Sequence, residues 1–74
     1  MLNRIEINPN IHFNKPCIKG TRIPVHNILE LVRDNISFSE IINNYYPDLT
    51  IDDIQACIQY AINIIEIEDI QVAV

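Results

Sequence analysis

The sequence is poor in several kinds of residue, and each shortage excludes a class of protein. Its 74 residues include one glycine, two histidines and no tryptophan, and no cation follows Arg33. No apolar run reaches the roughly 20 residues that a membrane-spanning helix needs. Met1 to Arg4 lead into no signal-peptide core. We therefore expect one small, soluble, cytoplasmic domain.

Isoleucine is abundant instead: the chain holds seventeen, within a composition that is 49% apolar. A domain of this length buries only about 60% of the surface that its unfolded chain exposes. So much apolar surface exceeds what one small core can take up. We therefore expect a protein partner or self-association as a homodimer.

Candidate groups for catalysis or metal binding are few. Cys17 and Cys57 form no closely spaced pair of the kind that structural zinc sites use. We expect two reduced, buried thiols that act as small apolar side chains, with a disulfide or a metal site as the alternatives. Neither His12 nor His26 has a nucleophile at a motif spacing. We predict no enzyme, no metal and no cofactor.

The charges divide along the chain. Residues 1–33 hold five cations and two acids, a net charge of +3, whereas residues 34–74 hold eight acids and no cation, a net charge of −8. Such asymmetry indicates one surface for a polyanion and another for a basic or apolar partner. A merely solvated acidic surface is the alternative for the second half.

The first 24 residues favour short strands. Residues 4–10, RIEINPN, alternate apolar and charged side chains before a proline, which predicts a strand. In CIKGTRI, β-branched residues flank Gly20, which takes a positive φ at little cost. We predict a tight turn there between short strands bounded by Pro16 and Pro24, and hence a short N-terminal β-hairpin.

Three helices should follow, because apolar residues then repeat at i, i+3, i+4 and i+7. The first begins near Pro24, and Pro47 ends the second. The second and third each begin with a capping box, in which a hydroxyl and a carboxylate satisfy free N–H groups. The boxes are Ser37 with Glu40 and Thr50 with Asp53. The apolar stripes, which should form one core, are Val25, Ile28, Leu29 and Val32; Phe38, Ile41, Ile42 and Tyr45; and Ile51, Ile54, Ile58, Ala61, Ile62 and Ile65.

A helix, a short helix, a tight connection and a longer helix form the outline of a helix-turn-helix domain, which other three-helix bundles share. The candidate DNA-binding residues follow from it. Lys15, Lys19 and Arg22 on the basic turn could hold phosphates. Gln55 and Gln59 on the third helix could pair with adenine. Solubilising charge on an exposed turn is the alternative, and DNA binding requires the three cations on the same face as Gln55.

Within residues 64–74, IIEIEDIQVAV, β-branched side chains alternate with others in two halves, and Asp69 breaks the phase between them. Period-two alternation predicts a strand rather than continued helix. We expect this segment, distinct from a domain of residues 1–63, to pair with a partner or a second copy, its acids facing a basic surface. The candidate partner-binding residues are Ile65, Ile67, Ile70 and Val72. A frayed tail is the alternative.

Two separated motifs carry a family resemblance. The stretches NKPCIKGTRIPVHNILEL and SFSEIINNYYPDLTIDDIQACIQYA make residues 4–62 similar to the domain of unknown function family 433. Lys19 stands where arginine is common in the family, and Gln55 where many members carry arginine. The first motif is matched at Lys15, Pro16, Cys17, Gly20, Thr21, Arg22 and Pro24.

The resemblance implies a homeodomain-like three-helix (helix-turn-helix) fold, mainly α, with a small N-terminal β element. It also implies a VapB-like antitoxin of a type II toxin–antitoxin system. Such a protein binds and neutralises a PIN-like ribonuclease toxin, and binds operator DNA as an autorepressor. A protein–protein interaction module without DNA binding is the alternative. An enzyme is the third interpretation, and it requires a clustered polar pocket that the sequence does not offer.

Overall fold

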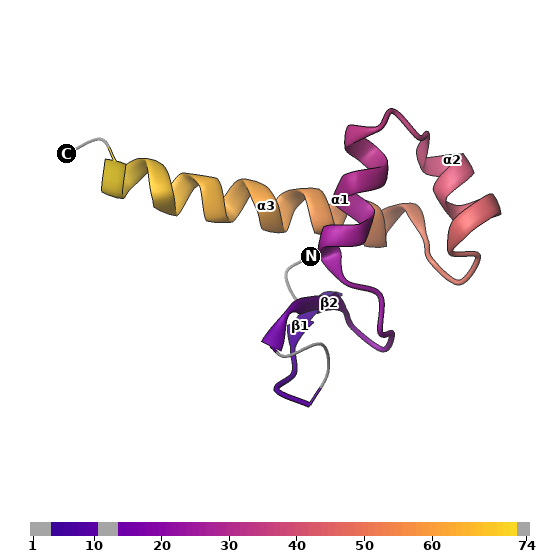
Figure 1. Ribbon diagram of the computed structural model, residues 1–74, viewed down its shortest axis with the longest axis horizontal. Coiled ribbons are helices and arrows are strands. Elements are labelled where there is room, and N and C mark those ends of the chain that lie inside the picture. The colour runs from indigo at the N-terminus through magenta and orange to yellow at the C-terminus, as the bar shows by residue number, and fades with distance from the viewer. Residues whose placement is uncertain (1–3, 11–13, 73–74) are drawn as a thin grey trace.

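The computed structural model describes residues 4–10 and 14–72, with side chains described as far as Ile67. The chain is mostly helical, with a small two-stranded sheet, as predicted. Figure 1 shows the sheet beside α3, α1 and α2 gathered around the start of α3, and the C-terminal half of α3 projecting away from the rest. The elements are β1 (Ile5–Ile7), β2 (Pro16–Ile18), α1 (Val25–Arg33), α2 (Phe38–Glu40), the π-helix η3 (Ile41–Tyr45) and α3 (Ile51–Val72).

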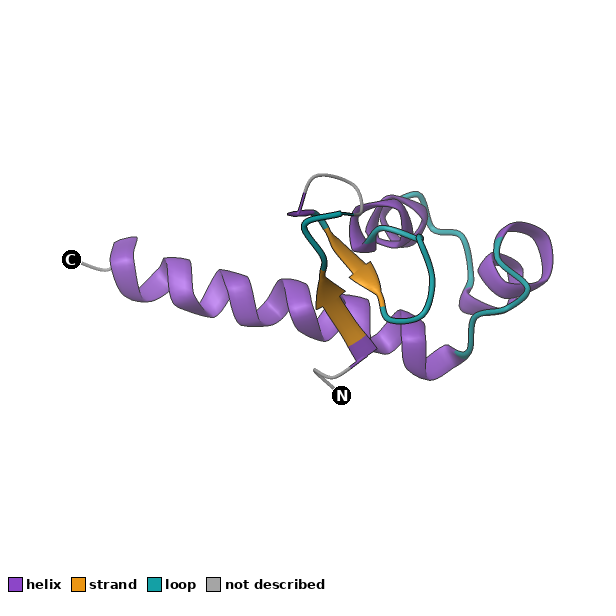
Figure 2. Ribbon diagram, turned by 90° about the horizontal axis from the view of Figure 1, so that it is seen from below, coloured by secondary structure: helices purple, strands orange, loops and turns teal. Residues whose placement is uncertain are grey.

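The sheet pairs β1 with β2 in antiparallel fashion, with Ile5 opposite Ile18 (Figure 2). The predicted tight turn follows β2: Gly20 has a φ of +79°, and the Thr21 N–H donates to the carbonyl of Ile18 at 3.0 Å. The second arm of the turn reaches β2 only through an isolated bridge at Pro24. The turn is therefore confirmed, but the strand that pairs with β2 is β1. Pro24 ends the second arm because proline has no N–H for a ladder.

The start of α1 agrees with the prediction, and its end is closed by local hydrogen bonds. Pro24 is its extended N-cap, and Asn35 follows it in the left-handed region, with a φ of +66°. The Asn35 N–H donates to Val32 O, and the Ile36 N–H donates to Leu31 O, both at 3.0 Å. This pair of bonds is a Schellman closure, which satisfies the last carbonyls of a helix.

The second predicted helix divides into two parts. The Ser37 hydroxyl accepts from the Glu40 N–H at 3.1 Å, as the capping box predicted. The chain then widens into η3, where the Tyr46 N–H reaches back five residues to Ile41 O at 2.8 Å. The extra residue in this turn rotates the end of the helix away from a regular apolar stripe. The prediction that Tyr45 joins the core is therefore wrong, since its side chain is exposed.

The third helix begins as predicted and ends much later. The Thr50 N–H donates to Asp53 Oδ2 at 2.9 Å, and the Asp53 N–H donates to Thr50 Oγ1 at 3.3 Å, which confirms the capping box. α3 then continues without a break to Val72, so the prediction of a strand over residues 64–74 is wrong. No glycine or proline follows Pro47, and extending an existing helix costs far less than starting one. A lone strand would also leave its backbone groups unpaired. Ala73 and Val74 lie outside the described residues.

One core joins the sheet and the helices. α3 contributes Ile54 to it, as predicted, with Ile58 packed at its margin, and also Cys57, which the predicted stripe did not include. Ile51, Ile62 and Ile65, expected in the core, are exposed. The buried cluster consists of Ile18, Val25, Ile28, Ile41, Leu49, Ile54 and Cys57.

Both cysteines are free and buried, which confirms the prediction of inert apolar thiols. Burial raises the pKa of the Cys57 thiol to about 12, with a smaller contribution from the charge of Asp53. Burial also raises the pKa of Cys17, helped by the charge of Glu6. Neither thiol is activated as a nucleophile, because the thiolate is the reactive form.

Within the part of the chain that the structure describes, no helix is both long enough and apolar enough to cross a membrane.

Candidate partner-binding site

The projecting half of α3 is apolar on more than one side. Ile62, Ile64, Ile65 and Ile67 are exposed to 41%, 39%, 55% and 58%. Consecutive helical residues point in different directions, so these four side chains do not lie on one face. A helix that is only solvated normally carries its apolar residues on one side. This segment is therefore a candidate protein-binding surface.

Two lines of side chains run along this part of α3. The inner line continues the side of the helix that packs in the core: Tyr60 is half-buried against the core, and Ile64 and Ile67 follow it at steps of four and three residues. The outer stripe lies on a different side of the helix. It consists of Ile51, Ile58, Ile62 and Ile65.

The structure separates residues that the sequence placed in one partner-binding segment. Ile65 and Ile67 would share a face of a strand, but in a helix two residues apart they point in nearly opposite directions. Ile65 belongs to the outer stripe and Ile67 to the inner line. Ile70 and Val72 lie in the last turns of α3, and their side chains are outside the described part.

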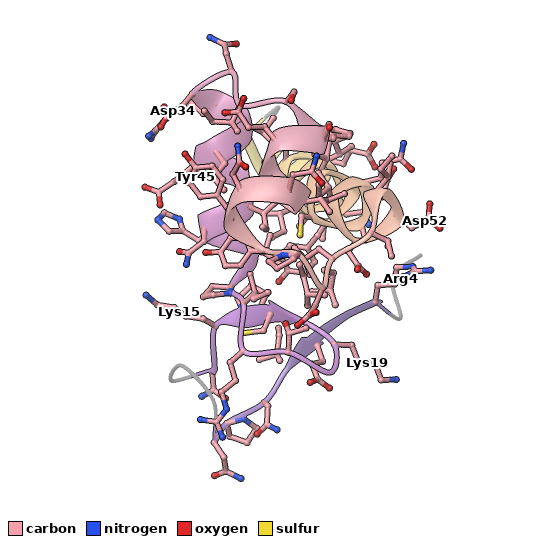
Figure 3. All side chains as sticks on the ribbon, turned by 90° about the vertical axis from the view of Figure 1, so that its right-hand side faces the viewer. Arg4, Lys15, Lys19, Asp34, Tyr45 and Asp52 are labelled. Atoms are coloured by element: carbon pink, nitrogen blue, oxygen red, sulfur yellow. The ribbon has the colours of Figure 1, made fainter. Side chains whose placement is uncertain are left out.

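An ion pair that the sequence did not reveal fixes the start of α3 to the sheet. Arg4, directly before β1, donates from Nη1 to Asp53 Oδ1 at 3.0 Å, and its Nη2 lies 3.6 Å from Asp52 Oδ2. Figure 3 shows Arg4 and Asp52 on the same side of the molecule. The contact spans 49 positions of the sequence, and no local pattern marks it.

The carboxylate of Asp53 takes part in both the capping box and the ion pair. Burial alone raises the pKa of Asp53. Hydrogen bonds from Thr50 and Arg4, with the positive charge of Arg4, outweigh this effect, so the pKa lies below its ordinary value. Asp53 is therefore charged at neutral pH, and it connects the N-terminus of α3 to the segment before β1.

The predicted DNA-binding cations lie on the surface but not together. Lys15, Lys19 and Arg22 are all exposed. In Figure 3, Lys15 lies on the side that carries Tyr45, whereas Lys19 lies on the side that carries Asp52. The two lysines, which flank β2, thus lie on different sides of the molecule.

The two predicted base-reading glutamines differ in their surroundings. Gln55 is exposed and lies along the outer stripe, between Ile51 and Ile58. Gln59 is half-buried, and its Nε2 donates to Asn63 Oδ1 at 2.9 Å, one turn later in α3. The amide of Gln59 is therefore already engaged within the helix.

A shallow groove of about 420 Å³ lies between α1 and η3, and sequence reasoning missed it. The Asn27 amide donates to the Tyr46 hydroxyl at 3.5 Å, and Arg33 Nε donates to Asp34 Oδ1 at 3.0 Å. Among the described residues, no buried side-chain nitrogen or oxygen lacks a hydrogen-bond partner. The lining residues are Asn27, Glu30, Leu31, Arg33, Asp34, Tyr45 and Tyr46.

Comparison with known proteins gives one family and one solved structure. The family model described as "Protein of unknown function (DUF433)" matches residues 5–61. The chain is also similar to a DUF433 member from Anabaena variabilis ATCC 29413, known from a crystal structure. That similarity has a TM-score of 0.77 and 30% sequence identity, and covers 97% of this chain and 70% of the other. Among curated proteins, none matches.

Proposed function

The chain belongs to the DUF433 family, and we propose that this member is an antitoxin-like protein that binds and neutralises a PIN-like ribonuclease toxin. The observation that carries the proposal is the exposed apolar half of α3, with Ile62, Ile64, Ile65 and Ile67. Covering an exposed isoleucine contributes up to about 1.5–3 kcal/mol, so a partner that encloses this segment gains substantial free energy. The class of partner comes from the family resemblance of the two motifs.

The charge of the chain supports a ribonuclease as the partner. Residues 34–74 carry eight acids and no cation. A ribonuclease holds a polyanionic substrate, so its substrate-binding surface is cationic. An acidic segment attracts the same surface, and can block it once bound.

Operator binding through a homeodomain-like helix-turn-helix arrangement is the second candidate function. The exposed amide of Gln55, near the start of α3, favours it. The neighbours of Gln55 on the helix surface, Ile51 and Ile58, disfavour operator binding. A helix that enters a groove of DNA would bring these isoleucines beside charged phosphates. We therefore rank toxin binding above DNA binding. A protein–protein interaction module without DNA binding remains consistent with this ranking.

Co-expression with a nuclease encoded beside this gene tests the proposal. The full chain should co-purify with the nuclease and suppress its cleavage of a fluorogenic RNA. Ile65→Ser should weaken inhibition by about tenfold or more, the effect of removing one well-packed interface side chain. Ile7→Ser is the matched control, since Ile7 on β1 is exposed to the same 55% as Ile65. Equal effects of the two variants, or an uninhibited nuclease with the wild-type chain, would contradict the proposal.

A further inference from the structure

The outer stripe of α3 follows the spacing of a helix–helix seam. Ile51, Ile58 and Ile65 recur every seven residues, and Ile62 lies between the last two. Side chains at this spacing form a nearly straight line along an α-helix, and such a line faces a second helix in coiled-coil packing. Ile51 and Ile65 are more than half exposed, Ile62 is exposed, and Ile58 is half-buried at the margin of the core.

The core uses little of this stripe, since only Ile58 packs at its margin. Among the α3 residues whose side chains are described, Ile54, Ala56 and Cys57 are buried, with at most 1% of their surface exposed. Ala56 and Cys57 lie on a different side of the helix, and Ile54 lies between that side and the stripe. The sheet, α1 and α2 pack against α3 on that side, in the arrangement that Figure 1 shows. α3 thus carries two apolar sides, of which its own chain uses one.

Gln55 also belongs to the seam. It occupies the alternate position between Ile51 and Ile58, where Ile62 lies one heptad later. A single polar residue at such a position fixes the register and the number of helices that pack together. The outer stripe with Gln55 therefore has the pattern of a surface that binds one partner helix in a single register.

The charges along the stripe favour a cationic occupant. Asp52, Gln59 and Glu66 each follow one of the seam isoleucines by one residue and so line one edge of the stripe. Arg4 compensates Asp52 at the start of α3. No cation occurs after Arg33, so the edge that contains Glu66 has no neighbouring cation in its own helix. A second copy of α3 would set acids against acids, which disfavours pairing.

We infer that the outer stripe of α3 is the docking site for a cationic amphipathic helix of the partner protein, which packs alongside α3 from Ile51 to Ile65. The inference rests on the proposed function, because it names the element of the partner that an antitoxin-like protein would bind. The docked helix covers Gln55, so partner binding and base contact through Gln55 exclude each other.

Synthetic peptides test the chemistry of the docking site without knowledge of the partner. One peptide carries isoleucine and leucine at heptad core positions and lysine at the flanking positions, and a second carries glutamate in place of lysine. We expect the full chain to bind the lysine peptide in fluorescence anisotropy, more weakly as salt increases, and to leave the glutamate peptide free. Equal binding of both peptides, or binding of neither, overturns the inference.

Two double variants of the full chain test which side of α3 is used. Ile62→Ser with Ile65→Ser removes the outer stripe and should weaken binding of the lysine peptide by at least about tenfold. Ile64→Ser with Ile67→Ser, the matched control on the inner line, should change it by less than about twofold. Thermal melts verify that both variants remain folded. A larger loss with the control pair overturns the inference, as does self-association of the wild-type chain that the outer-stripe variant abolishes.

The nuclease assay separates this inference from the proposed function. If the chain binds the lysine peptide through Ile62 and Ile65 but inhibits no neighbouring nuclease, the docking site stands and the antitoxin function fails. If it inhibits the nuclease and that inhibition depends on Ile64 and Ile67, the function stands and the docking site fails.

Discussion

Replacing Ile54 and Ile51 by alanine, one at a time, compares two isoleucines of one helix that differ mainly in burial. Ile54 is 0% exposed and belongs to the core cluster, whereas Ile51, three residues earlier, is 52% exposed. Both substitutions remove the same atoms. The difference between the two variants therefore reports the packing of α3 against the core.

The expected loss at Ile54 is large for a chain of this size. Truncating a buried isoleucine to alanine costs about 2–5 kcal/mol, because the removed atoms were both buried and closely packed. At about 0.05–0.15 kcal/mol per residue, the free energy of unfolding of 74 residues is only about 4–11 kcal/mol. For a domain of this length, each kcal/mol lowers the melting temperature by about 4–8 °C. Ile54→Ala should thus melt at least about 8 °C below the wild-type chain.

Ile51→Ala should change the free energy of unfolding by less than about 0.5 kcal/mol, as for most surface positions. Thermal and urea melts followed by circular dichroism measure both variants under the same conditions. Similar melting temperatures for the two variants would refute the assignment of Ile54 to the core. A large loss at Ile51 would instead show that the outer stripe is already covered in the free protein.

Three further predictions concern the carboxylate of Asp53, the thiol of Cys57 and the basic turn. Burial alone raises the pKa of Asp53, but the hydrogen bonds of the capping box and Arg4 hold it below 3.8. The charged Asp53 carboxylate should therefore stabilise the fold fully above about pH 4, and this stabilisation should disappear as the pH falls through the lowered pKa of the folded state. In urea melts, Asp53→Asn should lose less stability on acidification than the wild-type chain. Burial raises the pKa of the Cys57 thiol to about 12, so a thiol reagent should label Cys57 rapidly only in the unfolded chain, as measured by mass spectrometry. Rapid labelling of the folded chain would contradict the burial of Cys57. If the basic turn binds operator DNA, the double variant Lys19→Ala with Arg22→Ala should bind DNA with a weaker salt dependence in gel shifts. The log–log slope of affinity against salt should fall by about 0.9 for each phosphate that the variant no longer binds. An unchanged slope would exclude the turn from the DNA-binding surface.

The starts of the helices and the tight turn could be predicted because short-range chemistry sets them. Thr50 and Asp53 satisfy one another's N–H groups whatever the rest of the chain does, and Pro24 can begin a helix but cannot continue a strand. Gly20 marks the one turn in the sequence that takes a positive φ at a glycine. These local interactions act within four residues, so they can be recognised in the sequence without knowledge of the tertiary structure.

Tertiary choices could not be predicted in the same way. The ion pair of Arg4 with Asp53 joins groups 49 positions apart, and neither residue has a local pattern that marks the other. On α3, isoleucine occurs on both the buried and the exposed side, so periodicity alone could not decide whether Ile54 or Ile51 enters the core. The π-helix η3 was missed because its widened turn depends on how Tyr46 and the following loop pack, rather than on a propensity for π-helix.

The wrongly predicted strand at the C-terminus carries information about the partner. Alternation places β-branched side chains on one face of a strand, but α3 turns by about 100° per residue, so residues two apart lie on nearly opposite sides of the helix. The same pattern that predicts a strand therefore distributes Ile62, Ile64, Ile65 and Ile67 around the helix. A sequence selected only for a solvated helix would gather its isoleucines on one side and place polar residues on the other. Their distribution around α3 supports our proposal that a partner protein encloses this segment, with the outer stripe as the proposed docking site of the partner's helix.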